Sequence, residues 1–205
     1  MTTATQRSAK GPAGGLRERK KRETWMALHR AALELVEDRG LADVTIDEIA
    51  ARADVSARTF FNYFPSKDAA VLGSQPDDVE RLAALVAGRP ADETPLEVMR
   101  HVSRTLLAPT SADPQLRLMR RRVLLSEPLL APALLGRNVR IEDTVTAALE
   151  RRLGLTPGTD LRPRVIAATV LAATRACMEH HQQGATGTLE ESVDEAFDIL
   201  AAGLR

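Results

Sequence analysis

The feature of this 205-residue sequence that most constrains its fold is the spacing of its apolar residues. They recur at intervals of three and four, as in Leu28, Ala31, Ala32, Leu35 and Val36, which places them on one face of a helix. We find no convincing stretch in which apolar and polar residues alternate between turn signals, as they do in a half-buried strand. The apolar residues are mainly Ala, Leu and Val, and Ala and Leu are strong helix formers. The sequence therefore predicts an all-α fold.

Capping residues and Pro or Gly breaks divide the chain into nine or ten predicted helices. Thr45 with Glu48, and Thr188 with Glu191, have the spacing of a capping box at a helix N-terminus. A break near Gly136 would divide one long helix. The predicted helices cover residues 16–39, 45–53, 57–64, 67–73, 77–87, 95–107, 115–125, 129–153, 162–183 and 188–204.

Charge and composition suggest three parts. Residues 1–15 are rich in Thr, Ser, Gly and Ala, so we expect a disordered arm. The net charge of the chain is zero, but residues 1–67 hold 12 basic and 9 acidic side chains, which points to a polyanionic partner for that part. We predict a small domain over residues 16–75 and a larger helical domain over residues 76–205.

The sequence carries no sign of an enzyme, a metal site or a cofactor. It has no Ser-His-Asp elbow, no phosphate-binding Gly loop and no His/Glu metal spacing, and His180 and His181 point about 100° apart on a helix. The single cysteine, Cys177, excludes an internal disulfide and is expected to be a small core residue. The N-terminus is polar and basic, with no signal peptide or membrane span, so we expect a cytoplasmic protein without a membrane partner.

Four of the six aromatic residues fall within residues 60–64, in the third predicted helix. The second and third helices are joined by a turn of three or four residues, which matches a helix-turn-helix whose last helix enters the DNA major groove. At 100° per residue, Phe60 and Phe64 share the inward face, and Phe61 lies at its boundary. The opposite face carries Arg58, Thr59, Asn62 and Tyr63.

These positions predict specific contacts with double-stranded DNA. The Arg58 fork matches guanine O6 and N7, although a phosphate is the alternative, and the Tyr63 hydroxyl would meet a phosphate. Phe61 either touches a thymine methyl or covers the edge of the core. Thr45 and Lys67 open helices that would face the backbone, and the basic run 17–22 would add nonspecific attraction. The predicted DNA-binding residues are Thr45, Ser56, Ala57, Arg58, Thr59, Phe61, Asn62, Tyr63 and Lys67.

In this region the sequence resembles the DNA-binding domain of TetR-family transcriptional regulators. The motifs "AALEL", "T-x-x-E-I-A", "A-x-V-S" and "F-x-x-Y-F-x-S-K" occur in order within residues 30–73. The resemblance implies an all-helical homodimer, a palindromic operator, and a C-terminal domain that binds a small effector, usually releasing a repressor. An activator, or a regulator without a ligand, is the alternative. The C-terminal part resembles mycofactocin-regulator-type members.

For the larger domain the sequence suggests a ligand pocket and a dimer interface. The arginines of residues 117–122 could clamp an acidic ligand, or they could be solvated or salt-bridged. The predicted pocket residues are Met99, His101, Val102, Arg104, Leu106, Arg121 and Leu125. The last two helices could pair with their two-fold mates, or their apolar faces could be buried within one chain. The predicted interface residues are Val165, Ala168, Thr169, Ala172, Ala176, Val193, Phe197 and Leu200.

Overall fold

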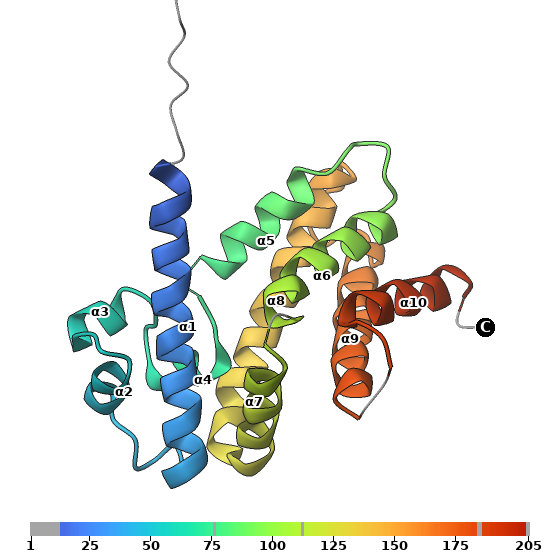
Figure 1. Ribbon diagram of the computed structural model, residues 1–205. Helices are drawn as coiled ribbons and strands as arrows, with labels where there is room; N and C mark the ends of the chain where they lie inside the picture. Colours follow the sequence, from blue (N-terminus) through green and yellow to red (C-terminus); the bar gives the residue numbers. More distant parts are fainter. Residues whose placement is uncertain (1–12, 76, 112, 184–185, 204–205) are drawn as a thin grey trace, which may run out of the picture.

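The computed structural model describes residues 13–75, 77–111, 113–183 and 186–203, and within these ranges it is entirely helical, as predicted (Figure 1). None of the described helices is long and apolar enough to cross a bilayer. The helices are α1 (Ala13–Arg39), α2 (Ile46–Arg52), α3 (Ala57–Phe61), α4 (Lys67–Leu72), α5 (Asp78–Ala87), α6 (Pro95–Ser111), α7 (Pro114–Ser126), the 3₁₀ helix η1 (Pro128–Leu130), α8 (Ala131–Arg152), α9 (Arg162–Gln182) and α10 (Leu189–Ala201).

Several helix boundaries differ from the sequence prediction; helix α6, for example, continues to Ser111 rather than ending at residue 107. Helix α1 begins at Ala13, so it takes in three residues of the expected disordered arm, whose residues 1–12 lie outside the described residues. Helix α3 ends at Phe61 rather than at Phe64, because Pro65 disfavours a helical conformation for the residue before it. Gly136 does not break α8, since a single Gly costs a long, packed helix only about 1 kcal/mol.

Helices α1 to α4 form a head around one apolar core, at the left of Figure 1. Phe60 and Phe64 are fully buried in this core, as predicted from their helical phase, and Leu28 and Ile49 pack beside them. Helix α7, which comes after residue 113 in the chain, contributes Leu116 and Val123 to the same core, and η1 adds Leu130. The head is therefore closed by an element from the C-terminal half of the sequence.

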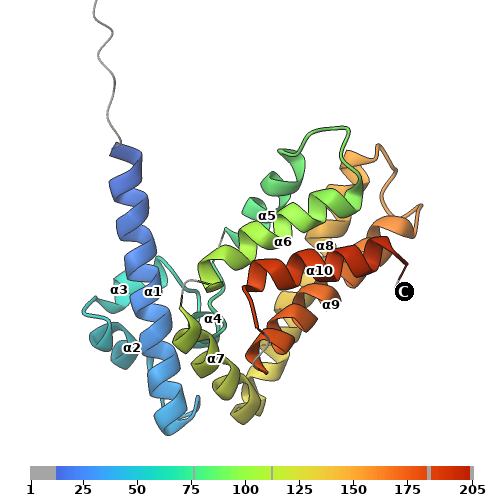
Figure 2. The same cartoon turned by 45° about the vertical axis from the view of Figure 1, so that its right-hand side comes forward.

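Helices α5, α6, α8, α9 and α10 form a second apolar core, which we call the body (Figure 2). Met99, Val102, Leu149 and Phe197 are at most 1% exposed there. The head and the body meet along α7 and at the end of α4, which also touches α8.

Polar contacts tie α7 to the end of α1. The Arg122 Nε donates to a Glu37 carboxylate oxygen at 2.5 Å. One turn later, at the end of α7, the Glu127 carboxylate accepts the Leu41 N–H at 3.1 Å, just beyond the C-terminus of α1. A movement of α7 relative to the body would therefore be passed directly to the head.

Candidate nucleic-acid interface

The start of α2 is fixed by the predicted capping box. The Thr45 hydroxyl accepts the Glu48 N–H, and the Glu48 carboxylate in turn accepts the Thr45 N–H at 2.8 Å. Arg39, in the last turn of α1, also donates to Glu48 at 2.8 Å. The Arg39 hydrogen bond, followed by the bonds from Thr45, lowers the pKa of Glu48 to about 2. The first helix of the motif is therefore held at its N-terminus by an ionised carboxylate.

The turn between α2 and α3 is a Schellman turn with an unusual residue. Asp54 has a left-handed backbone (φ 55°), a conformation that favours Gly and is tolerated by Asp more easily than by most residues. The Val55 N–H donates to the Ala50 carbonyl at 2.9 Å, and the Asp54 N–H donates to the Ala51 carbonyl at 3.1 Å. These bonds set the angle at which α3 leaves α2.

Helix α3 separates an inward face from an outward face. Ser56 caps it by accepting the Thr59 N–H at 3.1 Å. Phe64, just beyond its end, packs against Trp25 of α1, with ring centroids 6.0 Å apart. Phe61 is 56% exposed and meets only the edge of the core, with its ring edge-on to Phe60. Phe61 thus touches the core only through this ring contact, and its contact with DNA stays a prediction.

The outward face of α3 carries the predicted DNA-reading side chains. Arg58 and Asn62 are exposed, and Thr59 and Tyr63 are half-buried. The Thr59 hydroxyl is 2.9 Å from that of Ser56, so both hydroxyls of the first turn share one hydrogen bond.

Lys67 has a different environment from the one expected. Its ammonium donates to the Leu41 carbonyl at 2.6 Å and to the Val44 carbonyl at 3.0 Å, and it lies 3.5 Å from the carbonyl of Ala42. The side chain therefore holds the loop between α1 and α2 against the start of α4. Two of the three ammonium N–H groups are thus engaged within the head, and no sequence pattern indicated this role.

The basic beginning of α1 lies beside α3. In Figure 1 this part of α1 projects beyond the rest of the head. Its side chains and those of the outward α3 face line one shallow hollow, which consists of Leu16, Arg17, Lys20, Lys21, Thr24, Thr59, Asn62 and Tyr63. Part of the predicted basic run and part of the predicted reading face thus form one continuous surface, which suits a polyanion.

Comparisons with known proteins agree with this geometry. Residues 28–72 match the model for bacterial regulatory proteins of the tetR family, and residues 93–205 match the model for the MftR C-terminal domain. The chain is a TetR-family transcriptional regulator. The resemblance to this family, including its mycofactocin-regulator-type members, is therefore confirmed.

Curated relatives support the same assignment, and a solved structure shares the fold. The chain is 31% identical to the HTH-type transcriptional regulator TcmR of Streptomyces glaucescens over 210 residues, covering 100% of this chain and 92% of that protein. It is 28% identical to the putative mycofactocin biosynthesis transcriptional regulator MftR of Mycobacterium tuberculosis over 176 residues, 84% of this chain and 87% of that one. The fatty acid degradation regulator FadR from Bacillus halodurans has the same fold, at 17% identity and a TM-score of 0.55, over 88% of this chain and 100% of that one. Transcriptional regulators of this kind are not enzymes.

The residues predicted to form a ligand pocket in this TetR-family chain do not come together. Met99 and Val102 are buried in the body core, and Leu106 packs against that core. His101 and Arg104 instead line an open surface hollow, and Leu125 is 73% exposed on α7. The apolar members of the set thus face the body core, whereas its polar residues on α6 lie on the outer side. Arg121, the seventh residue, is half-buried on α7.

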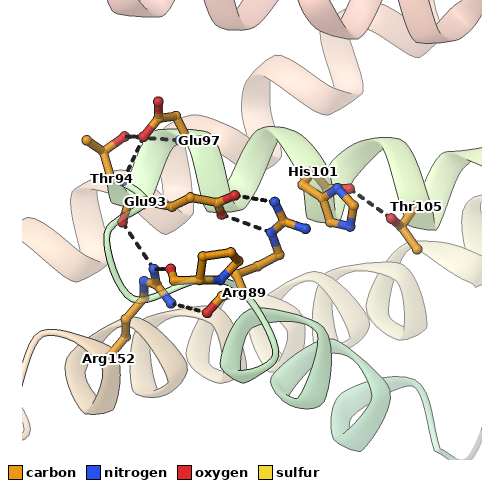
Figure 3. Close-up of polar contacts among 8 residues, drawn as sticks. Arg89, Glu93, Thr94, Glu97, His101, Thr105 and Arg152 are labelled. Carbon is orange, nitrogen blue, oxygen red and sulfur yellow. Dashed lines mark hydrogen bonds and ion pairs between the residues drawn. The ribbon is translucent and has the colours of Figure 1, made fainter.

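Polar contacts hold the loop before the start of α6 (Figure 3). Arg152 of α8 donates to the carbonyls of Arg89 and Glu93, both at 3.1 Å, and so holds the loop between α5 and α6. The Arg89 guanidinium also pairs with the Glu93 carboxylate. His101 takes part through its carbonyl, which accepts the Thr105 hydroxyl at 2.9 Å. The contacts of Arg152 and Arg89 stabilise this loop.

The predicted dimer surface is divided by the structure. On α9 the small-residue positions and Val165 are all exposed, and they form a stripe of Val165, Ala168, Thr169, Ala172 and Ala176. On α10, Val193 and Phe197 are fully buried in the body core, so their assignment to the dimer interface is wrong. Leu200 is half-buried. Cys177 lies in the same core, as expected, and burial raises the pKa of its thiol.

Two half-buried arginines, Arg120 of α7 and Arg137 of α8, were not predicted from the sequence. Arg122 pairs with Glu37, but Arg120 turns inward to the Leu72 carbonyl, so the arginines of residues 117–122 do not act as one clamp. A signal for Arg137 was present in the sequence. It occupies a position on the inward stripe of α8, four residues before Ile141 and eight before the buried Val145.

Proposed function

We propose that this TetR-family regulator is a homodimeric repressor that binds a palindromic operator and is released from it by a small effector. The observation that carries the DNA part is the continuous surface formed by the outward face of α3 and the basic beginning of α1. A helix whose outward residues are polar, with cations beside it, suits a major groove flanked by phosphates.

Within this proposal several side chains of the head have specific roles. Arg58 reads a guanine through its fork, and Phe61 lies against a thymine methyl. Tyr63 and Thr45 contact phosphates, while the arginines and lysines of residues 17–22 supply attraction that does not depend on base sequence. We assign Lys67 to holding the loop between α1 and α2, because its ammonium is engaged there.

We further propose that the exposed α9 stripe pairs with its two-fold mate. Small side chains let two helices approach closely, and Val165 is 51% exposed in the single chain. The two α3 helices of such a dimer would enter successive major grooves, about 34 Å apart or at a somewhat larger separation.

The effector is proposed to enter the body and act through α7. The second core is apolar, so a largely apolar molecule would replace the contacts of residues such as Met99 and Val102. Helix α7 closes the head core and is bonded to α1 through Arg122 and Glu127, so its displacement would move one reading head relative to the other. The effector shifts this equilibrium only if it binds one arrangement better than the other.

Selection of binding sites from random DNA with the full chain tests the proposal. We expect a two-fold symmetric sequence, bound by two chains, with each half-site protected by one head. A selected site without symmetry, or binding by a single chain, would contradict the dimeric arrangement. In cells, removal of the regulator should raise transcription from promoters that carry the selected site. A fall in transcription would identify an activator instead.

A further inference from the structure

Helix α7 runs beside α1 in the same direction and is held to it at three successive levels (Figure 2). At the first level, Arg30 of α1 pairs with Asp113, the residue that caps the start of α7. The pair of Arg122 with Glu37 follows near the ends of both helices. The bond between Glu127 and the loop after α1 comes last. Because the partners follow the same order in both segments, α7 is fixed to α1 along its whole length.

The apolar side of α7 also belongs to the head. Leu116, Val123 and Leu130 recur at intervals of seven residues, and all three are buried in the head core. Elsewhere on α7, Leu118 and Leu125 are exposed. In the part of the chain that the structure describes, α7 packs more extensively against α1 than against any helix of the body. Helix α7 is thus a structural part of the head, although it follows α5 and α6 of the body in the chain.

The loop after α1 is held from two sides by opposite charges. Glu127 accepts the Leu41 N–H at 3.1 Å, and Lys67 donates to the carbonyl of the same residue at 2.6 Å. Both backbone polar groups of Leu41, which is only 4% exposed, therefore depend on charged side chains from outside the loop. If Glu127 moved away, the Leu41 N–H would be left buried and unpaired, which is unfavourable.

Gly40 allows the Glu127 carboxylate to approach this loop closely. Its backbone is left-handed, with a φ of 81°, and a Cβ at this position would lie 3.3 Å from Oε1 of Glu127. Glycine is therefore favoured here both by the conformation and by the space.

Two of the chain connections between body and head lie next to these contacts. The chain enters α7 from α6 at Asp113, which is paired with Arg30, and it leaves toward η1 and α8 at Glu127. The body is thus joined to α7 at residues that are themselves bonded to the head. The orientation of the head on the body depends on these bonds.

We propose that Glu127 is a positioning residue for operator binding, whose bond to Leu41 fixes the head on the body and thereby the half-site spacing that the dimer accepts. This inference rests on the proposed dimeric function. In a dimer joined through its bodies, the separation of the two α3 helices depends on how each head sits on its body. One added base pair moves a half-site by about 3.4 Å and turns it by about a tenth of a helical turn, so a rigid pair of heads rejects it. Without the Glu127 bond the head adjusts to the altered spacing.

Binding of the full chain is measured to the selected operator and to versions with one or two base pairs added or removed between the half-sites. The unchanged protein should prefer the selected spacing by about tenfold or more. Glu127→Ala should reduce this preference to about threefold or less and leave the base preferences within each half-site unchanged. Glu127→Gln keeps an oxygen that accepts the Leu41 N–H, so it should retain most of the preference. Glu195→Ala, a matched change at an exposed glutamate of α10, should behave as the unchanged protein.

Hydrogen exchange of the same proteins tests the bond independently of DNA. The Leu41 amide should exchange about tenfold faster in Glu127→Ala than in the unchanged protein. The Phe64 amide, which donates to the Phe60 carbonyl at 2.9 Å inside the head, should keep its rate. Faster exchange at both amides, with affinity lost equally at every spacing, would mean that Glu127 only stabilises the head, and would overturn the proposal.

The proposal is also overturned if the Leu41 amide exchanges at the same rate in Glu127→Ala, or if that variant keeps the full spacing preference. A failure of the proposed function gives a different result, because the unchanged protein would then select a site without two-fold symmetry. That result would overturn the role in spacing together with the dimeric function, and the exchange of Leu41 would still decide whether the Glu127 bond forms.

Discussion

The buried imidazole of His29 should make the head sensitive to acid. Its ring is 5% exposed, stacks on Trp25 at a centroid distance of 5.3 Å, and lies 2.6 Å from the Ala70 carbonyl through Nδ1, which must therefore carry the proton. Burial lowers the pKa of His29 from 6.5 to about 4, partly offset by the Ala70 bond, and the charges of Arg120 and Arg30 lower it further. Between pH 6.5 and about 4 the folded head therefore keeps this imidazole neutral, whereas the unfolded chain protonates it.

The size and sign of the effect follow from proton linkage. Because the folded pKa is the lower one, the unfolded state binds more protons between pH 6.5 and about 4, and stability falls as the pH falls through that window. Each pH unit below the unfolded pKa costs about 1.4 kcal/mol. Lowering the pH from 7.5 to 5 should therefore reduce the free energy of unfolding of the head by about 2 kcal/mol.

Urea unfolding, followed by the fluorescence of Trp25, measures this loss where it arises, since Trp25 is the only tryptophan and stacks on His29. The control is His29→Asn, whose amide can still donate to Ala70 but does not titrate. This variant has a lower starting stability, because it leaves space in the core, but it should lack the loss between pH 7.5 and 5. Carboxylates whose pKa is lowered by ion pairs, such as Glu37, remain charged at pH 5. Equal pH dependence in both proteins would refute the argument.

Three further predictions concern the reading head and the dimer. Phe64→Ala should lower the free energy of unfolding of the head by ~3–5 kcal/mol, because the ring is fully buried. Phe61→Ala should change that free energy by no more than about 0.5 kcal/mol and should weaken operator binding instead. Equal stabilities of the two variants in urea would contradict the separation of the aromatic residues into buried and exposed members. Lys67→Ala should cost ~1–3 kcal/mol in the same assay, because the Leu41 and Val44 carbonyls lose a charged donor, and should leave the salt dependence of DNA binding unchanged. A salt slope lower by about one would instead restore a phosphate contact for Lys67. Ala172→Glu should convert the dimer to a monomer in sedimentation, while Ala91→Glu in the exposed α5–α6 loop should not, and a dimer in both would exclude the α9 stripe.

Features that depend on local sequence could be predicted well. The capping boxes at Thr45 and Thr188 form as expected, since each needs only residues three apart. The inward direction of Phe60 and Phe64 follows from helical phase within one short segment. The resemblance to TetR-family regulators rested on the same local motifs, and it was confirmed over both parts of the chain.

Features that depend on which helices meet could not be predicted. Phase gives an apolar face on α10 but does not say whether Phe197 faces another helix of the same chain or a second chain, and the structure shows that it faces its own core. Likewise, α7 has the composition of a body helix, and its place against the head is set by contacts that span about 85 residues. Lys67 was assigned to DNA because a helix N-terminus favours phosphate, but the nearby carbonyls of Leu41 and Val44 bind its ammonium.

The central claim, that α3 presents Arg58 to a base, is tested most directly by a base-pair scan of the selected operator. Affinity is measured for every single substitution in one half-site, with the unchanged protein and with Arg58→Ala. The account predicts that the variant loses discrimination at one guanine-containing pair, by ~1–3 kcal/mol, and keeps its preferences elsewhere. A variant that keeps the full preference at every position, or that weakens binding to all sequences equally, would contradict base reading by Arg58.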